Sequence, residues 1–111
     1  MATTLVQNST IIAVNNIGTS PGTIIAQGPR NSITFHNPGS VDIVVFPLTV
    51  LQNVPGGSSV ALVPSTAVLG GGFRIFANGG DRTVEGQAAS QGWQALSISG
   101  SGNPLTIMVT S

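Results

Sequence analysis

Residues 30–47 have the sequence RNSITFHNPGSVDIVVFP, and this stretch decides the fold. Ile33 and Phe35 alternate with polar residues, which places two large apolar side chains on one face of a β-strand. The next four residues, Asn37-Pro38-Gly39-Ser40, are typical of a turn, because proline fixes φ, glycine accepts positive φ and asparagine can bond its own backbone. A second β-branched run follows over 41–47. We therefore predict a strand, a four-residue connection and an antiparallel return, which together form a hairpin.

Short β-rich runs separated by Gly, Pro and Asn turns fill the rest of the chain. Val, Ile and Thr supply 33 of the 111 residues, and no apolar pattern at helical spacing lasts ten residues. Seven to nine short strands predict an all-β chain, folded as a single antiparallel β-sandwich of jelly-roll or immunoglobulin-like type or as a small barrel. Residues 1–14 are expected to be a β-rich arm or the first strands, and 15–111 the sandwich domain. The further strands are expected near 3–7, 10–14, 23–27, 48–51, 59–63, 73–77, 83–86, 91–98 and 105–109, with a helical turn as an alternative at 65–69.

The charged residues are few and balanced. Three arginines and three acids give a formal net charge of zero, and there is no lysine. Ser, Thr, Asn and Gln supply 37 residues, so neutral polar groups must cover most of the surface. Such a surface carries almost no net field to keep copies apart, which favours a hydrogen-bonded assembly over a dilute monomer.

Several partner classes lack the residues that they require. Without a basic patch there is no source of phosphate affinity, so we expect no nucleic acid partner. No apolar run approaches the roughly 20 residues of a membrane-spanning helix, and the first residues resemble no signal peptide. The absence of cysteine excludes disulfides and fits synthesis in a reducing cytoplasm.

Catalytic and metal-binding sets are also poorly supplied, so we expect no enzyme and no cofactor. His36 and Asp42 with a serine are the only material for a hydrolytic triad, and no serine is expected on the strained strand-to-helix turn that carries many such nucleophiles, because the chain has no helical pattern. Paired carboxylates would have to come from Asp42, Asp81 and Glu85. Oxygens of Asn78, Asp81 and Glu85 could offer a calcium site, although their spacing matches no EF-hand loop.

Trp93, Arg30 and Arg74 are the candidates for a partner interface. A lone tryptophan can anchor an interface or a ligand, but at the start of a strand it is more often a core residue. Each arginine can make a bidentate bond to a carboxylate of a neighbouring chain, although pairing within this chain, with Asp42 or Glu85, is favoured.

A family resemblance rests on four segments of residues 30–111. RNSITFHNP (30–38), the strand over 41–47, SVAL (59–62) after a Gly-rich turn and GWQA (92–95) resemble small β-sandwich virion proteins of tailed bacteriophages. The resemblance implies a structural role without an active site, either as a small accessory piece of a spike or tail or as a capsid decoration or cement protein. Such a protein would bind the major capsid protein on the virion surface, as a symmetric homo-oligomer with a trimer favoured, after assembly in the host cytoplasm.

Two further expectations follow. The N-terminal segment 1–14, with Leu5 and Val6, is expected to add a strand to a neighbour or to the shell, because extended chains bond through their backbone. The alternative function is a carbohydrate- or receptor-binding module of a phage tail, fibre or spike. That alternative needs exposed aromatic rings, for which Trp93 and Phe76 are the candidates.

Overall fold

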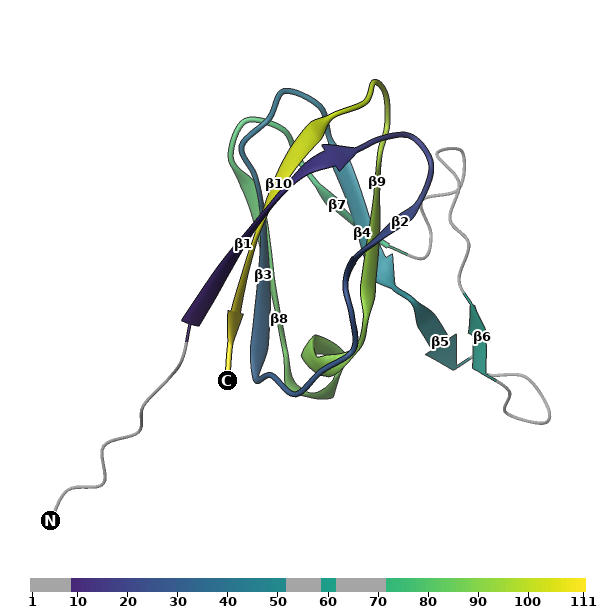
Figure 1. The fold of residues 1–111 in the computed structure, drawn as a ribbon, viewed down its shortest axis with the longest axis vertical. Helices are drawn as coiled ribbons and strands as arrows, with labels where there is room; N and C mark the ends of the chain where they lie inside the picture. Colours follow the sequence, from purple (N-terminus) through teal and green to yellow (C-terminus); the bar gives the residue numbers. More distant parts are fainter. Residues whose placement is uncertain (1–8, 52–58, 62–71) are drawn as a thin grey trace, which may run out of the picture.

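The computed structural model describes residues 9–51, 59–61 and 72–111. They contain ten strands and one short 3₁₀ helix, connected by turns and loops. Eight of the strands form two antiparallel sheets of four, so the predicted all-β sandwich is confirmed (Figure 1). The predicted strand at 3–7 and the helical turn at 65–69 lie outside the described residues. The elements are β1 (Ser9–Ile17), β2 (Gly22–Ile25), β3 (Ser32–Asn37), β4 (Ile43–Pro47), β5 (Thr49–Leu51), β6 (Ser59–Ala61), β7 (Phe73–Ile75), β8 (Gly80–Glu85), η1 (Gly86–Ser90), β9 (Trp93–Ser97) and β10 (Asn103–Thr110).

The strand order identifies the sandwich as a jelly roll. Sheet A has the order β1-β10-β3-β8 and sheet B the order β2-β9-β4-β7. Leaving aside the separate β5-β6 pair, the first strand therefore pairs with the last, the second with the next to last, and so on inward to β4 with β7. This nested pairing is that of a long hairpin wrapped into two sheets, and it differs from the order of an immunoglobulin sandwich.

The predicted hairpin over 30–47 is wrong, because β3 and β4 belong to opposite sheets. Both strands are present, but the turn between them crosses the core instead of reversing within one sheet. Asn37 fixes this corner: it is fully buried, its Nδ2 donates to the carbonyls of Val41 (2.8 Å) and Ile75 (3.0 Å), and its Oδ1 accepts from Gly39 N (3.0 Å). The crossing lets Ile33 and Phe35 of β3 pack in the same core as Ile43 and Val45 of β4.

The core between the sheets centres on Trp93, which is 1% exposed. Its ring packs against Phe35 with a centroid distance of 5.1 Å and against Phe73 at 6.2 Å. The Arg82 guanidinium lies 4.1 Å from the centroid of Phe73. A layer of three aromatic rings, capped by one cation, thus closes the side of the sandwich where β7 and β8 are the edge strands.

The inner strands of sheet B, β4 and β9, are largely buried on both faces, whereas sheet A has one open face. Val44, Phe46 and Leu96 alternate with the inward-facing residues of β4 and β9, yet they are at most 1% exposed and form a second apolar cluster. Gly72 approaches them so closely that a Cβ there would lie 2.8 Å from Val44 Cγ1. In β3, by contrast, Ile33 and Phe35 are buried and the alternate residues are partly exposed. The outer face of sheet A is therefore the larger surface available to a partner among the described strands.

Candidate functional site

The outer face of sheet A is a regular grid set by the strand registers. Each of its three rows crosses the sheet in the order β1, β10, β3, β8. The rows are Ser9, Thr110, Ser32 and Glu85; Ile11, Met108, Thr34 and Thr83; and Ala13, Thr106, His36 and Asp81. We call these twelve residues the outer face.

Hydroxyl groups and two apolar side chains dominate the outer face. Ser32 Oγ is hydrogen-bonded to Thr110 Oγ1, and Thr34 Oγ1 lies 2.9 Å from Thr83 Oγ1. Ile11 and Met108 are cross-strand partners that are 68% and 39% exposed. An apolar pair surrounded by neutral hydroxyls suits a docking surface better than a reaction site.

The charged residues gather on the opposite side of the sandwich from β1. Asp81, Arg82 and Glu85 are on β8, Arg74 is on β7, and Asp42 is ion-paired with Arg74. The sixth charge, Arg30, is held in the β2-β3 connection. The β1 and β2 edges therefore carry no ionic group, as the sequence of each strand shows.

The three predicted interface residues that the structure describes all make contacts within the chain. Trp93 is a core residue, and its Nε1 donates to the Ala88 carbonyl at 3.2 Å, so its ring offers no surface to a partner. Leu5 and Val6 lie outside the described residues. Trp93 is therefore a core residue, which is the alternative that sequence analysis favoured.

Arg30 holds three backbone segments together. Its guanidinium donates to the carbonyls of Ala89 (2.6 Å), Gln91 (2.9 Å) and Ala26 (2.7 Å). Desolvation lowers the pKa of Arg30, although a guanidinium stays protonated at neutral pH. Sequence analysis missed this role, because residues about 60 positions away supply two of the carbonyls.

Arg74 pairs with Asp42, as the internal alternative predicted. Arg74 Nε and one terminal guanidinium nitrogen each lie 2.8 Å from Asp42 Oδ2, while Oδ1 accepts from Ala77 N at 2.7 Å. The Ala77 hydrogen bond and the Arg74 guanidinium hold the pKa of Asp42 below its ordinary value. With both oxygens engaged, Asp42 is not available to orient His36, whose cross-strand neighbours are Thr106 and Asp81.

The acids proposed for a carboxylate pair or a calcium site do not converge. Asp81 and Glu85 lie four residues apart on β8, a separation of about 13 Å along an extended strand, so they cannot share one ion. Among the described residues, no three His, Cys, Asp or Glu side chains lie together as metal ligands would. The same residues include no helix long and apolar enough to cross a bilayer.

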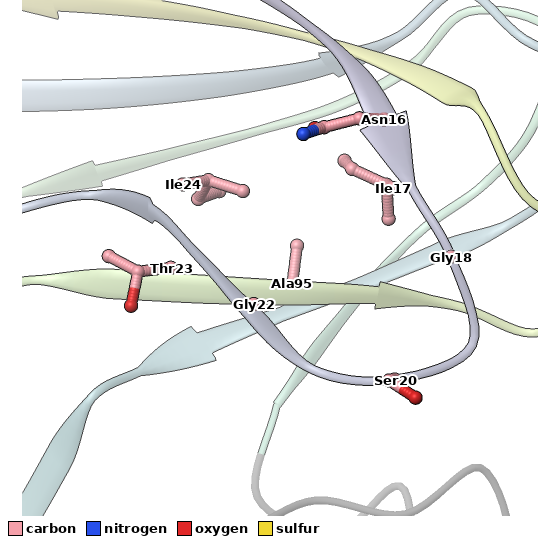
Figure 2. Close-up of a pocket in the computed structure, with 8 residues that line it drawn as sticks. All are labelled: Asn16, Ile17, Gly18, Ser20, Gly22, Thr23, Ile24 and Ala95. Atoms are coloured by element: carbon pink, nitrogen blue, oxygen red, sulfur yellow. The ribbon is translucent and has the colours of Figure 1, made fainter.

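A small cavity lies at the connection between the end of β1 and the start of β2, on the side of the sandwich where these two are the edge strands. Its volume is about 90 Å³. Figure 2 shows Ile17, Ile24 and Ala95 around it, with Asn16, Ser20 and Thr23 also contributing to the lining. None of the lining side chains is charged, so the cavity offers a ligand only weak polar contacts.

Ile11 and Met108 are the surface residues that sequence analysis missed. The signal for Ile11 was present in the sequence, since adjacent Ile11 and Ile12 on one strand must point to opposite faces. Met108 follows the same alternation, between buried Ile107 and half-buried Val109.

Comparison of the chain with protein-family models, curated proteins and solved structures finds no match.

Proposed function

We propose that this protein is a structural virion protein, which decorates and stabilises a phage capsid by binding its outer shell as a symmetric oligomer. The observation that carries the proposal is the outer face of sheet A, where exposed Ile11 and Met108 lie among neutral hydroxyl groups. Interfaces of this kind have an apolar centre and a hydrogen-bonding rim, and charged residues are depleted from the centre. The partner would be the major capsid protein, and the site of action the capsid surface.

Two further observations support the proposal. Jelly rolls are common in viral capsid proteins, although lectin domains also use them, so the fold alone does not decide the function. Asp42 is held by Arg74 and Ala77, so its carboxylate contributes to the fold and not to a pair with His36. The resemblance of residues 30–111 to virion β-sandwich proteins supports a structural role in the particle, and the neutral hydroxyl groups of the outer face favour attachment to the capsid among these roles.

The test uses virions purified from the host that carries this gene. The chain should be present in a fixed ratio to the major capsid protein, and electron microscopy should show it on the outer shell with sheet A against the capsid. Met108→Lys should reduce its occupancy, whereas Ile98→Lys, at a residue of almost equal exposure (38% against 39%) outside the outer face, should leave it unchanged. Absence of the chain from the particles, or equal binding by both variants, would contradict the proposal.

Carbohydrate or receptor binding by a tail, fibre or spike protein is the second candidate, and Phe76 favours it. This ring is 62% exposed, and the Arg74 guanidinium lies 5.8 Å from its centroid, which leaves an aromatic surface beside a cation. Sugars stack on such rings. Binding to a glycan array that is lost in Phe76→Ala and kept in Met108→Lys would support this function.

A further inference from the structure

The four edge strands of the sandwich differ in how well they are protected against pairing with another strand. Proteins protect a free edge with charges, proline, irregular register or short length. In sheet B, β7 has three residues with Arg74 at its centre, and β2 has four residues with a register shift between Thr23 and Ile25. In sheet A, β8 carries Asp81, Arg82 and Glu85.

The β1 edge has none of these protections in its regular part. It is nine residues long, with the sequence STIIAVNNI, and contains no charge and no proline. It is regularly paired with β10 as far as Val14, and its first irregularity lies between Val14 and Ile17. Because β1 ends the order of sheet A, the other half of its backbone N–H and C=O groups has no partner strand within the described chain (Figure 1).

We propose that two copies of this chain associate through β1, antiparallel to each other about a two-fold axis, so that their A sheets form one eight-stranded sheet. A second copy is the occupant favoured by the charge pattern. An isologous contact places like residues close to each other, and a strand without ionic groups has no repulsion to overcome. The proposal stands apart from capsid binding, which uses the outer face.

The regular part of β1 also specifies the register. Outward-facing residues lie opposite outward-facing residues only when the two-fold axis lies midway between two copies of the same residue. A register shifted by one residue would turn every side chain to the other face. The stretch Thr10–Val14 is centred on Ile12, so Ile12 would lie opposite its own copy, Ile11 opposite Ala13, and Thr10 opposite Val14. Half-buried Ile12 and Val14 would then continue the core across the axis.

The same register gathers the exposed apolar residues. Met108 is the β10 neighbour of Ile11, so the row across the joined sheets would be Met108, Ile11 and then Ala13 of the second copy. The symmetric row would lie beside it. Ile11, with 68% of its surface exposed in the single chain, would move from an outer edge to the middle of a sheet.

The first test measures the molar mass of the full chain by light scattering at tens of micromolar. We expect the mass of two chains. The double variant Ile11→Lys with Ala13→Lys should have the mass of one chain, because the register places two pairs of like charges directly opposite each other. The matched control is Met108→Lys with Thr106→Lys, which puts the same charges in the same two rows one strand further in, and it should remain a dimer.

The emission of Trp93 and the circular dichroism spectrum show whether each variant is folded. A wild-type mass of one chain or of three chains overturns the proposal, and so does a folded Ile11→Lys, Ala13→Lys variant that stays dimeric. A trimer would leave the capsid proposal standing. A dimer that is absent from virions would support the association through β1 and contradict the capsid proposal, so the two proposals can fail separately.

The second test fixes the register by disulfide trapping, which is clean because the chain has no cysteine. When the Ile11→Cys chain is mixed with the Ala13→Cys chain, a covalent dimer of the two should form, since opposite residues lie about 4.5–5.5 Å apart between Cα atoms, within reach of a disulfide. Neither variant alone should cross-link efficiently, because its cysteines would be diagonal neighbours about 7–8 Å apart. Rapid cross-linking of Ile11→Cys alone, or none in the mixture, would contradict the register.

Discussion

The two long sides of the sandwich are closed in different ways. On the side of β7 and β8, Phe73 fills the space between the sheets, packs against the central Trp93 and is covered by Arg82. On the side of β1 and β2 the strands carry no charge, and a cavity of about 90 Å³ remains between them. The Arg82 cation therefore covers the side of β7 and β8, which we call the closed side. The side of β1 and β2, which we call the open side, has no ionic group on these two strands and is suited to contact a second surface.

The largest expected effect comes from the aromatic layer of Trp93, Phe35 and Phe73. Trp93→Ala should lower the free energy of unfolding by about 3–5 kcal/mol, because it removes the largest buried side chain and leaves a cavity. Ile24→Ala, on the open side, should cost roughly 1–2 kcal/mol, since Ile24 is half-buried and already borders an empty space. Urea unfolding should be followed by circular dichroism for both variants, because Trp93 is the only tryptophan and its fluorescence is lost in Trp93→Ala. Equal losses would show that the two sides are packed alike.

The Asp42 carboxylate gives the next effect. At neutral pH, Asp42→Asn should destabilise the fold by about 1 kcal/mol, because it removes the charge that pairs with Arg74, and that pair is partly exposed and therefore screened by solvent. The folded chain lowers the pKa of Asp42, so at low pH it binds fewer protons than the unfolded chain does.

The stability contributed by Asp42 is therefore present above the unfolded pKa, near 3.9, and is lost as the pH falls through the lower folded value. Unfolding measured between pH 7 and pH 2 should show the difference between wild type and Asp42→Asn shrinking below about pH 4. A difference that grows towards acid would contradict the assigned direction of the pKa shift.

Much of this architecture could be predicted from sequence, because it depends on local chemistry. Alternation predicted that Ile33 and Phe35 share one face of a strand, and both side chains are fully buried on the inner face of β3. Alternation does not state which sheet a strand joins, however. The hairpin prediction failed at Asn37 for this reason, since a turn sequence that suits a reversal also suits a corner when its amide is buried against Ile75.

The candidate site was harder to predict, because its residues meet only through long-range pairing. Ile11 and Met108 are almost a hundred positions apart in the chain and become neighbours through the β1-β10 ladder. Arg30 was expected to pair with a carboxylate, preferably Asp42 or Glu85 of this chain, but it donates instead to the carbonyls of Ala89 and Gln91. Sequence analysis correctly favoured a core position for Trp93. Nothing in the local sequence, however, indicated that its ring would lie between Phe35 and Phe73.

A smaller effect is expected at Arg82. Arg82→Ala should destabilise the fold by about 0.5–1 kcal/mol, the usual range for a cation over an aromatic ring at an exposed site. Arg82→Lys should recover part of this loss, because a cation can still reach Phe73. Thermal unfolding of the two variants measures the difference, and a loss in Arg82→Ala that Lys does not reduce at all would show that the Arg82 charge is not what stabilises Phe73.

The smallest effect tests whether the outer face is tied together before any partner binds. The hydroxyl pair Thr34 and Thr83 joins β3 to β8 in the same row in which Ile11 and Met108 join β1 to β10. A double-mutant cycle with Thr34→Val and Thr83→Val should give a coupling of about 0.5 kcal/mol, typical of a cross-strand hydroxyl pair. The cycle needs a single protein concentration throughout, because association would itself stabilise the folded state. A coupling of zero would mean that both hydroxyls prefer water, so that a partner docking on this face would have to order them, whereas the expected coupling means that the polar half of the row is already in place.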